Sequence, residues 1–148
     1  MGDVDADALI VALRAMGDRS SDGARAAADA MALGAEREIK RTLRTTSHPK
    51  GAPTPSAPGT PPSLVSGSLR RSVKAGRPRQ TGAARWEAKT APTIVYSRIH
   101  ELGGWTGRGH RSYLPPRPYV RPTRARLVAS GDLERWANRA FAAKVGLT

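Results

Sequence analysis

Four prolines within the nine residues Leu114–Pro122 restrict the fold of this chain more than any other feature of its sequence. Proline fixes its own φ and has no backbone N–H to donate, and it pushes the residue before it towards extended geometry. The segment therefore cannot be a helix interior or a central strand, and we expect a stiff, extended stretch. Tyr119 and Val120 form an apolar pair between Arg117 and Arg121, which suits a docking arm or a structural bracket rather than an active site.

The first third of the chain predicts two helices, Asp5–Met16 and Ala24–Thr45, with a break at Gly17–Gly23. Apolar side chains at helical spacing form one face of each helix: Leu9, Leu13 and Met16 in the first, and Ala28, Met31 or Ala32, Ala35, Ile39 and Leu43 in the second. Glu36 and Lys40 are spaced as a favourable i,i+4 pair on the second helix.

Proline, glycine and charge divide the rest of the chain, which at 148 residues is about one domain. We expect an α+β fold in which a long N-terminal helix and a C-terminal helix pack on a small antiparallel β-sheet. The predicted parts of the single domain 1–148 are N-terminal helices over 5–46, a proline-rich arm over 47–64, a sheet region over 65–122 with a basic loop at 104–113, and a C-terminal helix over 123–146.

Within the sheet region, the pattern predicts one helical turn at Ser66–Arg71 and a strand near Ser72–Lys74. Gly76–Ala83 is expected to be a basic loop, and the alternating segment Ala84–Thr90 is expected to pair with Thr93–Tyr96 as a hairpin.

A helical turn at Arg98–Leu102 should end at Gly103-Gly104. After Pro122 we expect a helix over Thr123–Ala129, a break at Gly131 and an amphipathic helix over Asp132–Val145.

The net charge of +13 is concentrated in one part of the chain. Residues 1–47 carry 7 Lys/Arg and 8 Asp/Glu, whereas the remainder carries 18 basic and 4 acidic residues. The densest patch, residues 108–126, has six arginines and no acid, which suits a polyanion or an acidic protein surface. The absence of cysteine excludes disulfides and thiol catalysis. The acidic N-terminus does not read as a signal peptide, and no apolar run is long enough to span a bilayer.

The sequence predicts neither catalysis nor metal binding. His48, His100 and His110 have no partner at metal-ligand spacing, and the carboxylates are too few and scattered for two-metal phosphoryl transfer. We therefore expect no catalytic, metal or cofactor-binding residues. The loop 104–113 mixes arginine, glycine and aromatic residues, which suits stacking on single-stranded nucleic acid or, equally, a plain surface loop. Within it, Trp105 is the candidate interface anchor.

Three motifs follow one another in a fixed order: Ser66-Gly67-Ser68-Leu69-Arg70-Arg71-Ser72, then Tyr96 to Gly103 with Glu101 two residues before its glycine, then Pro116-Arg117-Pro118-Tyr119-Val120-Arg121-Pro122. In this order the chain resembles the gene-ten-type neck or tail-completion proteins of long-tailed bacteriophages over roughly residues 5–145. It is also similar to the related virion-morphogenesis proteins of contractile-tailed phages.

The resemblance implies a small structural α+β subunit of the virion, assembled in the host cytoplasm and acting at the head–tail junction. The implied partners are the stopper or adaptor, the tail terminator, the tail tube and further copies of the chain in a ring, six being the family-like number. Contact with packaged DNA is a further expectation, and neither a membrane nor a cofactor is expected. Two other readings stay open: a tail terminator that caps the tube, and a small basic nucleic-acid-binding protein.

The candidate motif and interface residues come from these segments. They are Ser66, Gly67, Leu69, Arg70, Tyr96, His100, Glu101, Gly103, Trp105, Arg108, Arg111, Pro116, Arg117, Pro118, Tyr119, Arg121, Pro122 and Arg124. We expect Glu101 to pair with Arg98 or with an arginine of 117–124, because a chain with few acids offers each of them many cations. Arg117 and Arg121 are expected either to face a partner or to be part of the fold, and Tyr119 is expected to enter the core or a neighbouring subunit.

Overall fold

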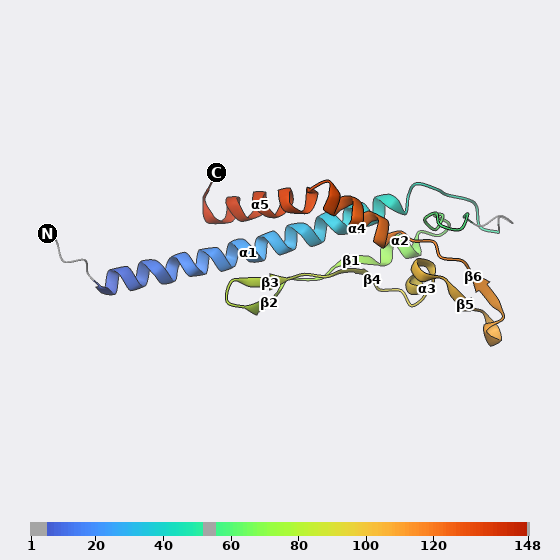
Figure 1. Ribbon diagram of the computed structural model, residues 1–148, viewed down its shortest axis with the longest axis horizontal. Coiled ribbons are helices and arrows are strands. Elements are labelled where there is room, and N and C mark those ends of the chain that lie inside the picture. The colour runs from blue at the N-terminus through green and yellow to red at the C-terminus, as the bar shows by residue number, and fades with distance from the viewer. Residues whose placement is uncertain (1–5, 52–55, 148) are drawn as a thin grey trace.

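The computed structural model describes residues 6–51 and 56–147. One long helix, α1 (Ala6–Thr42), forms the axis of an elongated α+β molecule (Figure 1). Helices α4 (Val120–Ala129) and α5 (Asp132–Val145) lie along one side of α1, and the short strands β1 to β4 lie along the other. The predicted α+β class, with an N-terminal and a C-terminal helix and antiparallel strands, is confirmed. The strands that the structure describes form three two-stranded sheets, whereas one small sheet was expected.

The predicted break at Gly17–Gly23 is wrong, because α1 runs through it without interruption. A glycine inside a helix costs about 1 kcal/mol relative to alanine but does not by itself end the helix. Gly23 instead lies against α5, where an added Cβ would come within 2.7 Å of the Phe141 ring. Gly34 is tighter still, since a Cβ there would lie 2.2 Å from the Trp136 ring. These two glycines allow the close approach of two helices.

The C-terminal helices largely follow the prediction. Helix α5 spans the expected residues, and Gly131 precedes it with a left-handed φ of 66°. Helix α4 begins earlier than expected, at Val120, and therefore contains Pro122 in its first turn. Proline is tolerated there because its missing N–H would have no partner within the helix.

The strands pair differently from the predicted hairpin of Ala84–Thr90 with Thr93–Tyr96. Strand β1 (Val73–Ala75) pairs with β4 (Thr90–Pro92), and β2 (Arg79–Gly82) pairs with β3 (Arg85–Glu87). Segment 76–83, expected as a loop, thus supplies a strand, and segment 93–96, expected as a strand, is a turn. Both strands of each pair are edge strands, so β4 can end in a proline. Residues 91–92 therefore belong to β4 rather than to a turn between two strands.

The basic segment 104–113 also differs from the prediction of a loop. Strands β5 (Gly104–Thr106) and β6 (Ser112–Leu114) pair as a hairpin around a short 3-10 turn at Arg108–His110. Helix α3 (Ser97–Leu102) precedes the hairpin and ends at Gly103, which has a φ of 71°, as the sequence predicts. Helix α2 (Ser68–Ser72) is the predicted turn before β1.

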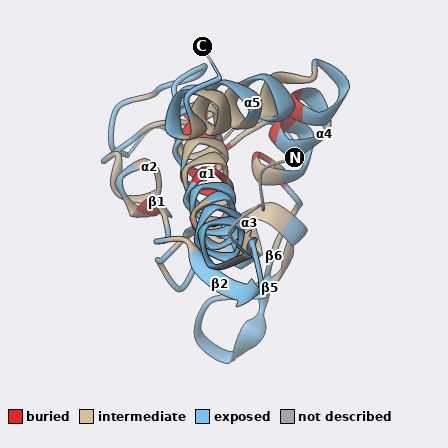
Figure 2. Cartoon of the chain, turned by 90° about the vertical axis from the view of Figure 1, so that its left-hand side faces the viewer, coloured by how far each residue is buried: buried red, intermediate tan, exposed pale blue. Residues whose placement is uncertain are grey.

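The core is small and lies where α1, β1 and the start of α4 meet. Its buried members are Ile39, Leu43, Val73 and Tyr119, and Figure 2 shows how few segments are fully buried. The predicted stripe of the second half of α1 is confirmed at Ala28, Ala32, Ile39 and Leu43, which are buried.

Polar contacts attach α1 to its neighbours. The Glu36 carboxylate binds Lys40, as the sequence predicts, and accepts the backbone N–H of Ala75 on β1 at 2.6 Å. The Glu38 carboxylate accepts from the Arg126 guanidinium on α4 at 2.8 Å. These contacts fix the spacing of strand, helix and helix. No helix among the described residues is both long and apolar enough to cross a membrane.

The proline-rich arm is fastened at its ends. Ser47 and Leu64 form an isolated parallel bridge, and the Leu64 N–H donates to the carbonyl of Thr46 at 2.8 Å. Farther along the arm, the Gly59 N–H donates to the carbonyl of Pro116 at 2.9 Å. The described part of the arm between these ends contains no helix or strand, as predicted, and residues 52–55 lie outside the described residues.

Candidate functional site

The three sequence motifs lie against one another around a single buried tyrosine. The first motif forms α2, the second ends in α3, and the third runs from the proline segment into α4. Tyr119 of the third motif is fully buried and packs with Ile39, Leu43 and Val73, with Leu69 of the first motif packed alongside. Tyr119 therefore enters the core of its own subunit. Burial, and secondarily the charge of Glu101, raises the pKa of its hydroxyl above its ordinary value.

Glu101 joins the second motif to the third through backbone donors. Its carboxylate accepts the N–H groups of Tyr119 at 2.8 Å, Val120 at 3.0 Å and Arg121 at 2.8 Å. These are the first amides of α4, which have no partner inside the helix. A carboxylate at a helix N-terminus is also favoured by the helix dipole.

The expected partner of Glu101 is therefore wrong. The carboxylate accepts backbone amides, including that of Arg121, rather than the side chain of Arg98 or of an arginine of 117–124. The physical reason is that the unpaired amides of a helix start need an acceptor once they leave water, whereas an arginine side chain can keep its charge in solvent.

Arg117 belongs to the fold of the subunit. The residue is 7% exposed, and its backbone N–H donates to the carbonyl of His100 at 2.7 Å. Of the two alternatives for Arg117, contact with a partner and a place in the fold, this burial fits the second, because the residues of the segment alternate between buried and more exposed positions. Arg121 and Arg124 are exposed on α4 and remain candidates for contact. Burial first, and the charge of Arg117 second, lower the pKa of the His100 imidazole.

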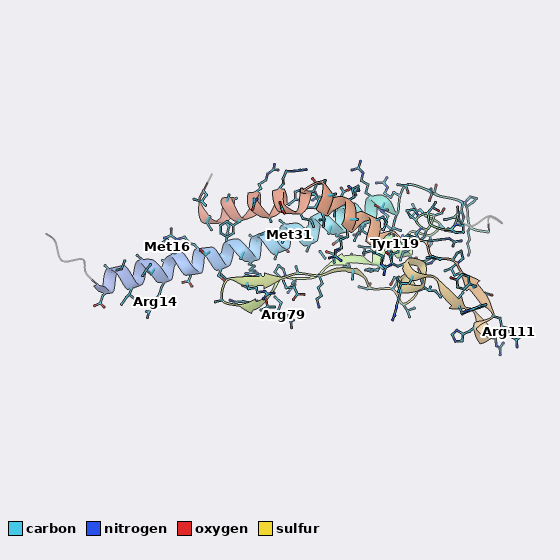
Figure 3. The ribbon with its side chains drawn as sticks, in the orientation of Figure 1. Arg14, Met16, Met31, Arg79, Arg111 and Tyr119 are labelled. Carbon is cyan, nitrogen blue, oxygen red and sulfur yellow. The ribbon has the colours of Figure 1, made fainter. Side chains whose placement is uncertain are left out.

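The β5–β6 hairpin is held against the proline segment by a glycine. An added Cβ at Gly103 would lie 2.8 Å from the backbone nitrogen of Pro116 and 2.9 Å from the carbonyl oxygen of Leu114. Its positive φ is a second reason for glycine at this position. The hairpin thus leaves the body at a fixed direction and extends beyond it, as the position of Arg111 in Figure 3 shows.

Exposed aromatic and basic side chains cover this hairpin. Trp105 and Tyr113 face each other across the strands, edge to face, with ring centroids 5.4 Å apart. They are 61% and 57% exposed. Arg108 and Arg111 are exposed at the tip. Two large aromatic side chains that pack in one geometry and remain exposed to solvent are typical of a contact surface.

The remaining candidates support the two segments that meet at Tyr119. The Ser66 hydroxyl accepts the N–H of Ser68 at 3.3 Å, at the start of α2, and Gly67 has a left-handed φ of 73°. Arg70 is half-buried. Tyr96 packs edge to face on the His100 ring, with centroids 5.7 Å apart.

Pro118 and Pro122 lie on either side of the start of α4, where Pro118 is half-buried and Pro122 is exposed.

Two further surfaces were not predicted as contact surfaces from the sequence. One is an apolar groove beside α1, and the other is the exposed apolar face of the first turns of α1. The helical spacing of Leu9, Leu13 and Met16 was visible in the sequence, but not the absence of a covering helix. Among the described residues, no three His, Cys, Asp or Glu side chains are grouped so that they could hold a metal ion.

Comparison with known proteins adds no relative. No family model, no curated protein and no solved structure matches this chain.

Proposed function

We propose that this chain is a structural subunit of a tailed bacteriophage that acts at the head–tail junction, as a neck or tail-completion protein. The observation that carries the proposal is the packing of its three motifs: Glu101 of the second motif binds the amides at the helix start that the third motif provides, and Leu69 of the first motif packs beside Tyr119. Motifs that resemble one family in order and spacing thus form one connected unit.

The exposed appendages support a role in assembly rather than in chemistry. The β5–β6 hairpin, the proline-rich arm and the N-terminal turns of α1 all extend from a small core (Figure 1). Each presents apolar or basic side chains to solvent, and such patches suit protein–protein contacts around a tail axis. The exposed Arg121 and Arg124 on α4 are candidates for the rim of the same contacts.

Electron microscopy of lysates from a phage or prophage that lacks this gene tests the proposal. We expect filled heads and free tails if the chain joins the two, and tails of runaway length if it terminates the tube instead. Intact virions in normal numbers would overturn the structural role. Complementation with Trp105→Ala and with Arg121→Ala then shows whether the hairpin or α4 makes the contact.

A second candidate function, nucleic-acid binding, is favoured by the hairpin alone. Exposed aromatic rings beside Arg108 and Arg111 are the arrangement on which unpaired bases stack. Binding driven by phosphates weakens steeply as salt increases. In a salt titration with single-stranded DNA, Arg108→Ala with Arg111→Ala should then weaken binding more than the charge-matched pair Arg77→Ala with Arg79→Ala, just before and at the start of β2. An equal loss from both pairs would indicate general attraction to a basic protein.

A further inference from the structure

The first turns of α1 present an apolar ridge that no other element among the described residues covers. Leu9, Leu13 and Met16, spaced at i, i+4 and i+7, are 50%, 57% and 61% exposed. They lie on the part of α1 that extends beyond the end of α5, where Figure 3 places Met16.

The ridge continues an interface that already exists inside the subunit. The same line of α1, followed at alternating steps of three and four residues, reaches Gly23 and Gly34, which pack against α5. Helix α5 ends near Gly23, since an added Cβ there would lie 2.9 Å from Val145. The packing face of α1 is therefore longer than the helix that covers it, and we call its uncovered part the apolar ridge (Leu9, Leu13 and Met16).

The same chain also has an apolar groove. It lies along α1 from Ala28 to Ile39, between Trp86 of β3 on one side and Leu127 of α4 on the other, and it has a volume of about 420 Å³. At 1.5 Å per residue, the groove extends for about 16 Å along α1 and the ridge for about 10 Å. The groove is thus long enough for all three ridge side chains.

The ridge cannot reach the groove of its own subunit. Both belong to one uninterrupted helix, in which Met16 and Ala28 are separated by about 18 Å along the axis. We propose that the apolar ridge of one copy of this chain inserts into the groove of the next copy. Because the ridge and the groove are different surfaces, the contact is head to tail, and its repetition closes into a ring or continues as a filament. The inference deepens the proposed function, on which the assignment of the ring to the virion rests, by naming the contact between subunits.

Sedimentation velocity on the purified full chain tests this contact. We expect concentration-dependent assembly of the wild type, and a loss of affinity of more than about 100-fold in Leu13→Glu, because a charge replaces a buried leucine. Val11→Glu is the matched control, since Val11 is equally exposed but lies on the opposite side of α1. A wild-type chain that stays monomeric, or an equal loss in Val11→Glu, would overturn the proposal.

Mixing two defective variants tests the head-to-tail geometry. Ala35→Phe fills the groove, and Ala88→Phe provides a second filling variant should the first fail to fold. Neither a groove-filled variant nor Leu13→Glu should assemble alone, but an equimolar mixture should form one-to-one heterodimers, because one intact ridge meets one intact groove. Assembly of a groove-filled variant alone, or no heterodimer in the mixture, would refute the contact. Such a result would leave the phage-deletion experiment as a separate test of the proposed function.

Discussion

Replacing Glu101 should destabilise the subunit far more than a surface carboxylate does. Removal of one capping acceptor costs about 0.5–2 kcal/mol, and the attraction between a carboxylate and a helix N-terminus contributes about 0.3–1 kcal/mol. Glu101 serves three amides at a partly buried helix start. We therefore expect Glu101→Ala to lower the free energy of unfolding by about 2–3 kcal/mol. Glu101→Gln keeps one acceptor oxygen but loses the charge, and it should cost about 1–2 kcal/mol.

Urea unfolding followed by far-UV circular dichroism measures this difference. The matched controls are Glu134→Ala and Glu134→Gln, because Glu134 is exposed on a helix of the same subunit. Amide hydrogen exchange gives the residue-level readout: Tyr119, Val120 and Arg121 should exchange faster in Glu101→Gln than in the wild type. Equal unfolding midpoints for the Glu101 and Glu134 variants, or unchanged exchange at the three amides, would refute the capping role.

Three other predictions use the same unfolding assay. Gly34→Ala should lower the free energy of unfolding by about 1–3 kcal/mol because the new Cβ meets the Trp136 ring. Gly17→Ala should raise it by about 0.5–1 kcal/mol, because no atom lies within 4 Å of the new Cβ. The reverse order of stabilities would contradict the packing. Burial lowers the pKa of His100 from 6.5, so the imidazole of the unfolded chain takes up a proton at a higher pH than that of the folded chain. The free energy of unfolding should therefore fall between about pH 7.5 and about pH 5.5 more steeply in the wild type than in His100→Gln. Parallel profiles for the two proteins would disprove this. The pKa of Glu36 is lowered from 4.5, mainly by its lysine partner and then by an amide of β1, so Glu36→Gln should cost about 1 kcal/mol at neutral pH, a difference that should vanish in acid as the wild-type carboxylate is protonated.

Local sequence signals were sufficient to predict the bounds of a helix where a single residue type marks its end. Helix α5 has its predicted bounds because Gly131 supplies the left-handed start. The turn at α3 ends at Gly103 for the same reason. In both cases a single residue type decides the backbone geometry, and no distant contact is needed.

The errors arise where the deciding contact is distant in sequence. Gly23 reads locally as a break, and only α5, more than a hundred residues away, shows it to be a packing position. The pairing of β1 with β4 passes over an intervening hairpin, whereas the pattern favoured the nearest neighbours. Short strands carry too little alternation to specify their partners.

The candidate site was predicted as a set of residues but not as an arrangement. The motif residues do gather, and the burial of Tyr119 was one of the two expected positions. The partners of Glu101 were missed because backbone amides have no side-chain signature in a sequence. The signal that could have found them is the helix start that follows Pro118, which requires an acceptor. The position of Arg117 was left open because nothing local in the sequence distinguishes the buried Arg117 from the exposed Arg121.

Because the proline-rich arm is held at its two ends, the stability of the rest of the subunit should depend little on the length of the arm. The bridge between Ser47 and Leu64 holds the points where the arm leaves and returns. The entropy of closing a loop grows only with the logarithm of its length, so that doubling it costs about 0.6 kcal/mol. The exposed turn at Lys50 and Gly51 is therefore a place where the chain can carry an inserted epitope or label without altering the fold.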